Sequence, residues 1–234
     1  GDPMNGGNYV VKFSNDEGGT TEQKASAVIA CCGVFYIPRD IKWPGRDSFG
    51  GYITHGSYDM LNPKKFAGNK VLIVGHGGFT IENVRTCVEY GASSVKVVCR
   101  VRHFSGPKIS SWLVSSQEYP LPGHLLLKSF QIMYDLLGVD VWSHSSVQTD
   151  KTHSMAFVKQ NATFGVTDVY FLACAYGFCE VIEDEVKDLS HHCAETVKGR
   201  KLECSVILKC LGSEMDPSFD EVMGLKEIKG YWVN

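Results

Sequence analysis

The clearest pattern of apolar and polar positions in this chain lies between residues 69 and 100, NKVLIVGHGGFTIENVRTCVEYGASSVKVVCR. A short aliphatic run, VLIV, is followed by a glycine-rich turn, by a longer stretch typical of a helix, and by a second apolar run, VKVV. A strand, a turn and a helix that leads to a second strand form a βαβ unit, whose two strands are parallel. Residues 70–100 are therefore predicted to form one such unit.

The chain before this unit is predicted to contain a β-hairpin and a linker. The runs NYVVKF (8–13) and TEQKASAVIACCG (21–33) are typical of strands, and the turn-rich stretch SNDEGGT separates them. Prolines and glycines recur between residues 34 and 63. Because these residues favour turns and irregular backbone, that stretch is predicted to be a linker with little regular structure.

The chain after the unit is predicted to contain one helix and two strands. Apolar residues recur at helical spacing in GHLLLKSFQIMYDLLGV (123–139), and the helix is expected to end at Gly138. MAFVKQ (155–160) and DVYFLACAYG (168–177) are typical of strands. The acidic run EVIEDEVKD (180–188) is predicted to be a solvated helix face or loop.

A weak internal repeat suggests how the domains are connected. AVIACCG (27–33) and VILKCLG (206–212) are similar runs that each end in a glycine, on either side of the βαβ region. This arrangement suits a domain inserted into another domain, with the chain leaving a sheet at Gly33 and returning to it at Gly212. The prediction is an α/β fold with four segments: 1–48, the linker 49–68, a Rossmann-like domain 69–204, and the return segment 205–234.

Composition excludes several classes of function. The 234 residues are 44% hydrophobic and carry a formal net charge of −3, which indicates a globular protein and gives no reason to expect a nucleic-acid partner. The longest apolar runs are too short for a membrane-spanning segment. Nine cysteines, with no C-x-x-C pair, indicate reduced thiols and a cytoplasmic location. His191, His192 and Cys193 are adjacent and lack the spacing of zinc ligands, so no metal is expected.

The glycine-rich turn is the strongest candidate for chemistry. Gly75, Gly77 and Gly78 lie between the strand and the helix, and Phe79 and Thr80 follow in the first helical turn. Glycines permit a tight turn and let a pyrophosphate approach the main-chain N–H groups at the helix N-terminus. The pattern favours a dinucleotide site, and a purely structural turn is the alternative.

The end of the second strand indicates which nicotinamide cofactor would bind. An NAD site usually has Asp or Glu about 20 residues after the glycines. This chain has Arg100 at the strand end and Arg102 just beyond it. A guanidinium can bind a 2′-phosphate, so NADP(H) is favoured, and an ordinary exposed arginine is the alternative.

The stretch PGRDSFGGYITHGSYD (44–59), together with the two glycine-ending runs, resembles the flavin-dependent monooxygenases of the flavin-containing and Baeyer–Villiger type. Their signature has Phe, Gly, His and an aromatic residue at fixed spacing. Phe49, Gly51 and His55 match it, whereas Asp59 stands at the aromatic position with Tyr58 one place earlier. At the second fingerprint the family usually has Ser and then Gly or Ala, where this chain has Phe79 and Thr80.

The resemblance implies an enzyme in which NADPH reduces FAD and the reduced flavin uses O₂ to oxygenate a small-molecule substrate. It implies that the glycine turn binds NADP(H), and that His55 couples cofactor position to the flavin. A histidine that bonds to linker backbone is the alternative for His55. The spacing identifies no catalytic acid or base.

The sequence contains no second glycine fingerprint for FAD. We therefore expect a partial FAD domain, whose partner is the remainder of that domain, and a chain that alone retains no flavin. Two further interpretations stay open. One is a disulfide reductase with two dinucleotide sites, and the other is a non-catalytic nucleotide-binding module.

Overall fold

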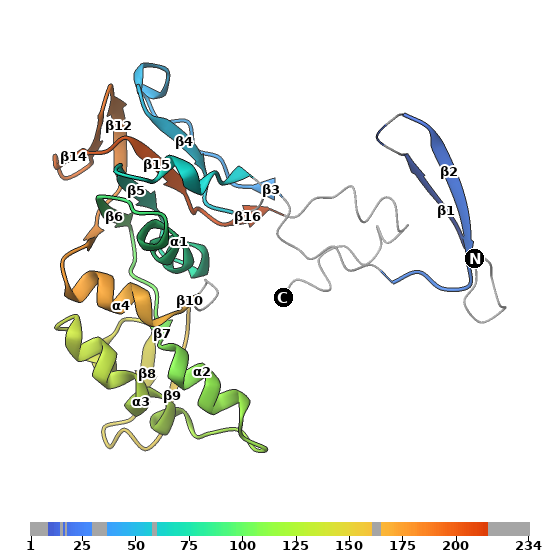
Figure 1. Ribbon diagram of the computed structural model, residues 1–234. Coiled ribbons are helices and arrows are strands. Elements are labelled where there is room, and N and C mark those ends of the chain that lie inside the picture. Colours follow the sequence, from blue (N-terminus) through green and yellow to red (C-terminus); the bar gives the residue numbers. More distant parts are fainter. Residues whose placement is uncertain are drawn as a thin grey trace. The chain divides into compact units, whose positions relative to one another are not determined.

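The computed structural model describes residues 9–14, 16, 18–29, 37–57, 60–160 and 165–214 (Figure 1). The chain divides into two units, one of Ile37–Glu214 and one that combines residues 1–36 with residues 215–234. In the second unit, β1 (Tyr9–Ser14) pairs antiparallel with β2 (Thr20–Ala25), as the hairpin prediction stated. The predicted repeat at Cys31–Gly33 lies outside the described residues.

A five-stranded parallel sheet forms the centre of the main unit. Its spatial order is β11-β6-β5-β15-β4. The strands are β4 (Tyr52–His55), β5 (Lys70–Val74), β6 (Ser94–Cys99), β11 (Cys179–Glu183) and β15 (Val206–Lys209). Helix α1 (Gly78–Glu89) connects β5 to β6, so the predicted βαβ unit is confirmed.

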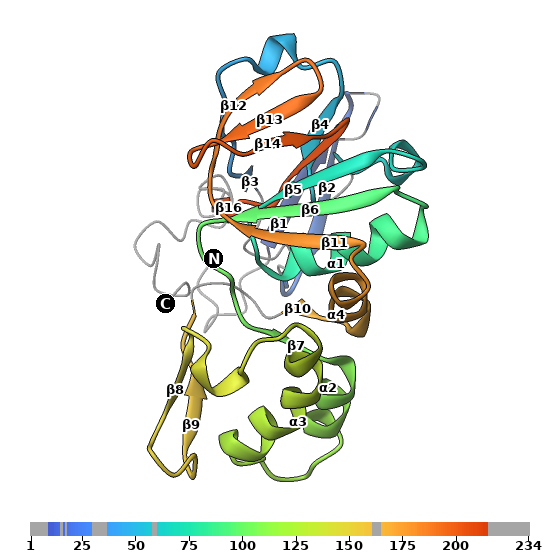
Figure 2. The ribbon, with the colours of Figure 1, turned by 90° about the vertical axis from the view of Figure 1, so that its left-hand side faces the viewer.

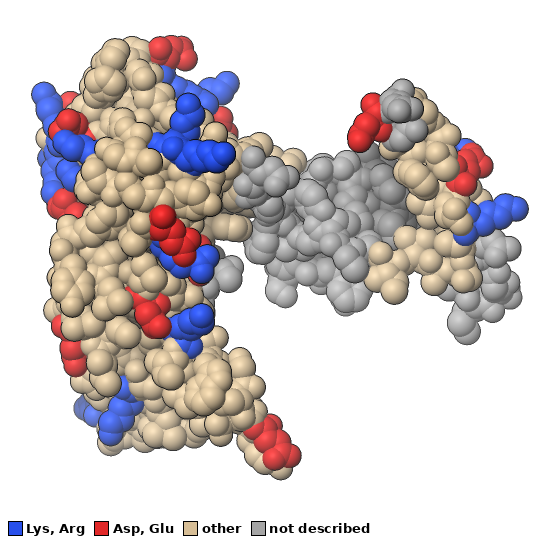
Figure 3. Space-filling view, in the orientation of Figure 1, with Lys and Arg blue, Asp and Glu red and all other residues tan. Residues whose placement is uncertain are grey.

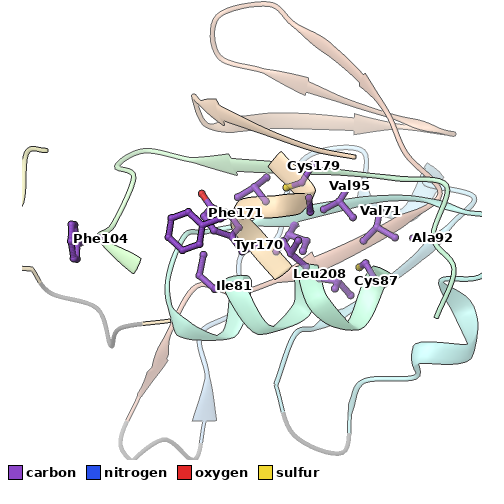
Figure 4. Close-up of a cluster of buried hydrophobic side chains, with 14 of the residues drawn as sticks. Val71, Ile81, Cys87, Ala92, Val95, Phe104, Tyr170, Phe171, Cys179 and Leu208 are labelled. Atoms are coloured by element: carbon purple, nitrogen blue, oxygen red, sulfur yellow. The ribbon is translucent and has the colours of Figure 1, made fainter. Parts of the chain in front are cut away.

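Different layers cover the two faces of this sheet (Figure 2). Val71 and Ile73 of β5 pack in one cluster with residues of α1 and of α4 (Asp168–Ala175), which Figure 4 shows. Leu72 and Val74, which point the opposite way, pack against a second sheet of β12 (Val186–Ser190), β13 (Cys193–Thr196) and β14 (Lys201–Glu203). Because both faces are buried, the strand consists of a continuous apolar run instead of an alternating one.

Two segments expected outside the Rossmann-like domain provide strands to its sheet. The stretch 49–68 was expected to be a linker, but it contains β4, which pairs with β15, and a 3₁₀ turn at Pro63–Lys65. The stretch 205–234 was expected to return to another domain, but β15 lies between β4 and β5. The sequence YITH is short, half polar and next to glycines, so its pattern resembles a loop.

The chain enters and leaves the main unit through neighbouring segments. β3 (Ile37–Pro38) pairs antiparallel with β16 (Ser213–Glu214), and Arg39 donates its main-chain N–H to the carbonyl of Gly212. A 3₁₀ turn at Arg46–Ser48 follows β3. The two segments that lead into and out of this unit therefore lie side by side.

Two secondary-structure predictions after residue 165 were wrong. DVYFLACAYG forms helix α4 instead of a strand, and the hydroxyl of Thr167 accepts a hydrogen bond from Val169 N at its start. Tyr170 and Phe171 are adjacent and both fully enclosed, so this helix shows no amphipathic period. Most of the acidic run 180–188 belongs to β11 and β12, where Glu180 and Glu183 are exposed while Ile182 and Val186 are buried, and Asp184 is buried between the two strands.

A helical lobe is inserted between β6 and α4. It contains β7 (Ser105–Gly106), α2 (Lys108–Ser115), α3 (Gly123–Leu136), a 3₁₀ turn (Val141–Ser143), β8 (Val147–Thr149), β9 (Ala156–Val158) and β10 (Gly165–Val166). The helix over 123–139 and the strand in 155–160 are confirmed, and Gly138 adopts a φ of 66° just beyond the helix end. Among the described residues, no helix combines the length and apolar character needed to cross a bilayer.

Candidate dinucleotide site

The glycine turn lies at the carboxyl end of β5, beside β15. From β5 the chain continues to β6 and β11 on one side, and only later adds β15 on the other side. Ligands of open α/β sheets bind where the strand order reverses in this way. Gly75 stands at this point, and Cys210 of the β15 end donates its N–H to the Val74 carbonyl.

Gly75 is required by the packing of the turn on β15. Its φ is 110°, a value that side chains rarely permit. A Cβ atom there would lie 2.1 Å from the carbonyl oxygen of Cys210. The first glycine of the motif therefore has a structural role that does not depend on a ligand.

Gly77 is the N-cap of α1, with an extended backbone (φ −129°, ψ −168°) and no side-chain cap. Gly78 begins the helix, and Phe79 in the first turn keeps 44% of its surface exposed. An uncapped helix start presents main-chain N–H groups and the positive end of the helix dipole, which together favour an anion.

Thr80 lies beneath the turn, away from solvent. Its side chain is fully buried and its hydroxyl donates to the Gly75 carbonyl at 3.1 Å. The Thr80 side chain therefore holds the turn against the helix, and its place near a pyrophosphate stays a prediction.

His76, inside the turn, was missed as a site residue. The main-chain N–H of His103 donates to its Nδ1 (3.1 Å), so the proton of the neutral ring is on Nε2, which donates to the Tyr170 hydroxyl (2.9 Å). The residue is 4% exposed, and burial, together with the nearby Arg102 charge, lowers the pKa of His76 to about 3. His76 thus ties the turn to the chain after β6 and to α4 as an uncharged group.

We expect this histidine to make the fold sensitive to acid. The pKa of His76 is about 3 in the folded protein, whereas the ordinary pKa of histidine is about 6.5. Between these two pH values the unfolded chain therefore binds one proton that the folded chain does not. The free energy of unfolding should fall by about 2 kcal/mol between about pH 7 and pH 5 from this residue alone. Urea titrations at both pH values should show a smaller fall for His76→Gln than for the parent. The exposed His192→Gln is the matched control, and an equal fall in all three proteins would contradict the assignment.

The two candidate arginines, Arg100 and Arg102, differ in how freely each could bind a ligand phosphate. Arg100 follows β6 directly and is exposed, and within the described part of the chain it forms no ion pair. Arg102 is more enclosed, and its Nε lies 3.6 Å from a carboxylate oxygen of Glu183 at the end of β11. Arg100 is therefore the better candidate for an anionic ligand.

His55 lies at the end of β4 in a cluster of charged groups. Its Nε2 is 3.8 Å from Oδ1 of Asp40, which also bonds to Nζ of Lys209 and lies 3.4 Å, at Oδ2, from Arg46. Lys209 is 3% exposed and directly opposite His55 in the register of the sheet. Burial and the Lys209 charge lower the pKa of His55, and the hydrogen bond from Lys209 lowers the pKa of Asp40. The alternative in which His55 only bonds to linker backbone therefore omits its main neighbours.

Asn83 joins this cluster to the glycine turn. Its Nδ2 donates at 2.7 Å both to the carbonyl of Gly56, next to His55, and to the carbonyl of Phe79. Gly56 leaves no room for a side chain, since a Cβ would lie 2.4 Å from Sγ of Cys210. The ends of β4 and β15 and the first turns of α1 thus form one connected unit.

The other signature residues have packing roles. Phe49 is 8% exposed, and a Cβ on Gly51 would lie 2.2 Å from the Ser205 carbonyl oxygen and 2.7 Å from the Phe49 ring. Tyr58 and Asp59 lie outside the described residues. The residues missed from the sequence are Asp40, His76, Asn83 and Lys209. A lysine within the apolar run VILKCLG was the one visible signal among them.

Comparisons with known proteins give relatives that are named monooxygenases. The chain is 31% identical over 103 residues to a trimethylamine monooxygenase of Roseovarius sp. (strain 217), a match that covers 44% of this chain and 22% of that protein. It is 28% identical over 83 residues to an acetone monooxygenase of Gordonia sp. (strain TY-5), covering 36% and 15%. No protein-family model matches the chain.

Solved structures agree on the fold. A cyclohexanone monooxygenase from Rhodococcus sp. Phi1, bound to NADP⁺, superposes with a TM-score of 0.55 at 14% identity, over 91% of this chain and 51% of that one. An open form of cyclohexanone monooxygenase gives a TM-score of 0.56 at 13% identity, over 91% and 53%. The chain thus spans about half the length of these structures and less of the curated relatives. The resemblance inferred from the sequence is confirmed by these comparisons.

Proposed function

We propose that residues 37–214 bind NADP(H) at the carboxyl end of β5, as the nicotinamide-binding part of a flavin-dependent monooxygenase. The observation that carries the proposal is the turn from Gly75 to Gly78, which ends in an uncapped helix start at the point where the strand order reverses. The monooxygenase relatives named above support the second half of the proposal.

The residues around the turn fit a dinucleotide. The N–H groups of the first turn of α1 and the absence of a side chain at Gly77 suit a pyrophosphate. Arg100, exposed at the end of β6, would bind the 2′-phosphate. Phe79, half-exposed beside the turn, would cover one side of the ligand. Arg102, whose Nε lies 3.6 Å from a Glu183 carboxylate oxygen, would add positive charge close to the 2′-phosphate.

His55 would couple ligand binding at the carboxyl edge of the parallel sheet to the position of the flavin in the whole protein. It is the last residue of β4, and Asn83 connects its neighbour Gly56 to the helix start. Movement of α1 when a ligand binds would therefore shift Gly56 through the hydrogen bond from Asn83. The shift of Gly56 would move the adjacent His55, which lies 3.8 Å from Asp40. NADPH supplies a hydride when bound, and the whole protein would pass it to FAD for oxygenation of a small substrate with O₂. The remainder of the FAD domain is the partner that this reaction requires.

The proposal predicts that the chain binds NADPH more tightly than NADH. A charge-assisted contact to the 2′-phosphate contributes about 1.5–3 kcal/mol, which corresponds to an affinity ratio of about 10- to 150-fold. Calorimetric titration with both cofactors should show this ratio for the parent chain. In Arg100→Ala the ratio should fall close to one, mainly through weaker NADPH binding.

Arg85→Ala is the matched control for this titration. Arg85 lies on α1, pairs with Glu82 and Glu89 and carries the same charge as Arg100, but it is not among the residues proposed to contact the ligand. It should leave the ratio unchanged. Equal affinities for NADPH and NADH in the parent, or an unchanged ratio in Arg100→Ala, would contradict the NADP assignment. Failure to bind either cofactor would contradict the dinucleotide site itself.

A further inference from the structure

A cavity of about 380 Å³ lies in the helical lobe, between α2, α3 and β9. Both ribbon views show this lobe below α1 and α4, beyond the end of the parallel sheet (Figures 1 and 2). The cavity residues fall between 106 and 166, so none of them belongs to the glycine turn at 75–80. It is therefore a separate feature of the same unit.

The described lining of the cavity is mostly apolar and carries no charge. Carbon-rich side chains such as Leu126, Leu127, Phe130 and Val158 provide most of its surface. None of the described residues that line it carries a charge. Figure 3 likewise shows mostly uncharged residues over this part of the visible face. Desolvating a charged ligand in such a site is costly, so the lining favours a neutral and largely apolar occupant.

Small side chains make up much of the cavity wall, and the α2 side of this wall is open to solvent at Ser111, Val114 and Ser115. Six of the lining positions are glycine, alanine or serine: Gly106, Ser110, Ser111, Ser115, Gly123 and Ala156. The helices approach each other through a hydrogen bond of 2.8 Å between the hydroxyls of Ser110 and Ser129. Ligand pockets are typically concave, mostly apolar and of about 300–1,000 Å³, so the size and the lining of this space suit a small molecule.

The floor of the cavity is rigid. The ring of Phe130 lies 5.3 Å from that of Phe104, which stacks on Tyr134 at 5.1 Å. The Tyr134 hydroxyl accepts from Ser105 N (2.9 Å) and donates to Ser105 O (3.1 Å), which fixes the stack to β7. A ligand would therefore meet a largely preformed surface, which lowers the entropic cost of binding.

Two hydroxyls give the cavity a polar side. Ser111 and Ser115 both line it and stand four residues apart on α2, so they lie one above the other on the same helix face. We propose that the cavity binds a neutral, largely apolar small molecule that carries one hydroxyl or carbonyl group, which bonds to Ser111 or Ser115. This site goes beyond the dinucleotide function and does not depend on it.

The test uses 1-naphthol and naphthalene, which differ only in one hydroxyl. Each should bind the chain with a stoichiometry of one, measured by competition with the fluorescent probe N-phenyl-1-naphthylamine. Since a hydrogen bond contributes a factor of about 2- to 10-fold, 1-naphthol should bind tighter than naphthalene by that factor. The double variant Ser111→Ala/Ser115→Ala should lose the difference and keep naphthalene binding.

Two variants with a larger side chain in the cavity wall test whether the ligand binds in this cavity. Ser111→Trp and Val114→Trp place a ring on the cavity side of α2, at exposed positions where folding tolerates it, and each should weaken probe binding at least tenfold. Ile109→Trp, on the same helix but not in the lining, should leave binding unchanged. Circular dichroism verifies folding of each variant. Unsaturable probe binding, equal affinities for the two naphthalenes in the parent chain, or full binding in both enlarging variants would overturn the proposal.

Discussion

Replacing Asp40 by alanine is expected to lower the free energy of unfolding by about 2–4 kcal/mol, because it leaves the buried Lys209 ammonium without its carboxylate. Lys209 is 3% exposed, and Asp40 bonds to its Nζ. Breaking a buried ion pair from one side costs more than the pair contributes, since the remaining charge has neither water nor a partner. The 41% exposure of the Asp40 side chain admits some water and sets the estimate below that of a fully buried pair.

Removing both charges should restore much of the stability. In Asp40→Ala/Lys209→Met the buried ammonium is gone and the nearby Arg46 is partly exposed to water, while methionine fills a space close to that of the lysine stem. Urea unfolding of the parent, the two single variants and the double variant gives the coupling energy directly. The exposed pair Lys70–Glu203 is the matched control, and Glu203→Ala should leave the urea midpoint of unfolding nearly unchanged, because water screens both charges. A double variant no more stable than Asp40→Ala would show that the ion pair is not the cause.

The parts of the fold that could be predicted are those with a strong local pattern. VLIV, the helix after it and VKVV are predicted correctly because the two apolar runs and the helical pattern between them follow directly in the sequence, with glycines marking the turn before the helix. β4 could not be predicted in this way. Its four residues YITH pair with β15, which is about 150 positions away along the chain, and nothing local encodes that pairing. The β-structure of 180–188 is equally hidden, since outward acidic residues are typical of helices as well.

The candidate site likewise contains residues that a local sequence pattern reveals and residues that only the tertiary structure brings together. The glycines at 75, 77 and 78 are visible because turn chemistry is local, and Arg100 is visible because it follows a strand. The contacts of His76 with Tyr170 and of Lys209 with Asp40 join residues 94 and 169 positions apart. Such pairs form only when the sheet brings the strand ends together. The sequence predicts where a ligand would bind, and the tertiary structure determines which residues hold that place in shape.

Gly75 and Gly77 of the glycine turn are expected to respond to substitution in opposite ways, Gly75 through stability and Gly77 through ligand binding. Gly75→Ala should destabilise the unit by about 3–6 kcal/mol, because it combines a φ of 110° with a Cβ placed 2.1 Å from a main-chain oxygen. Gly91→Ala is the control for backbone conformation alone. Gly91 has a φ of 70° and nothing within 4 Å of its Cβ position, so the cost should be about 1 kcal/mol. Thermal unfolding of both variants separates the conformational cost from the steric one.

Gly77→Val should behave in the opposite way. The extended backbone at Gly77 suits any residue, so the chain should fold, with a circular dichroism spectrum like that of the parent. Binding of NADPH should nevertheless be lost, because the valine methyl groups would occupy the space that the pyrophosphate needs beside the helix start. Calorimetric titration of the folded variant measures this. If Gly77→Val folds and still binds NADPH, the turn has only the structural role that Gly75 shows. If Gly75→Ala is as stable as Gly91→Ala, the contact with Cys210 does not constrain the turn.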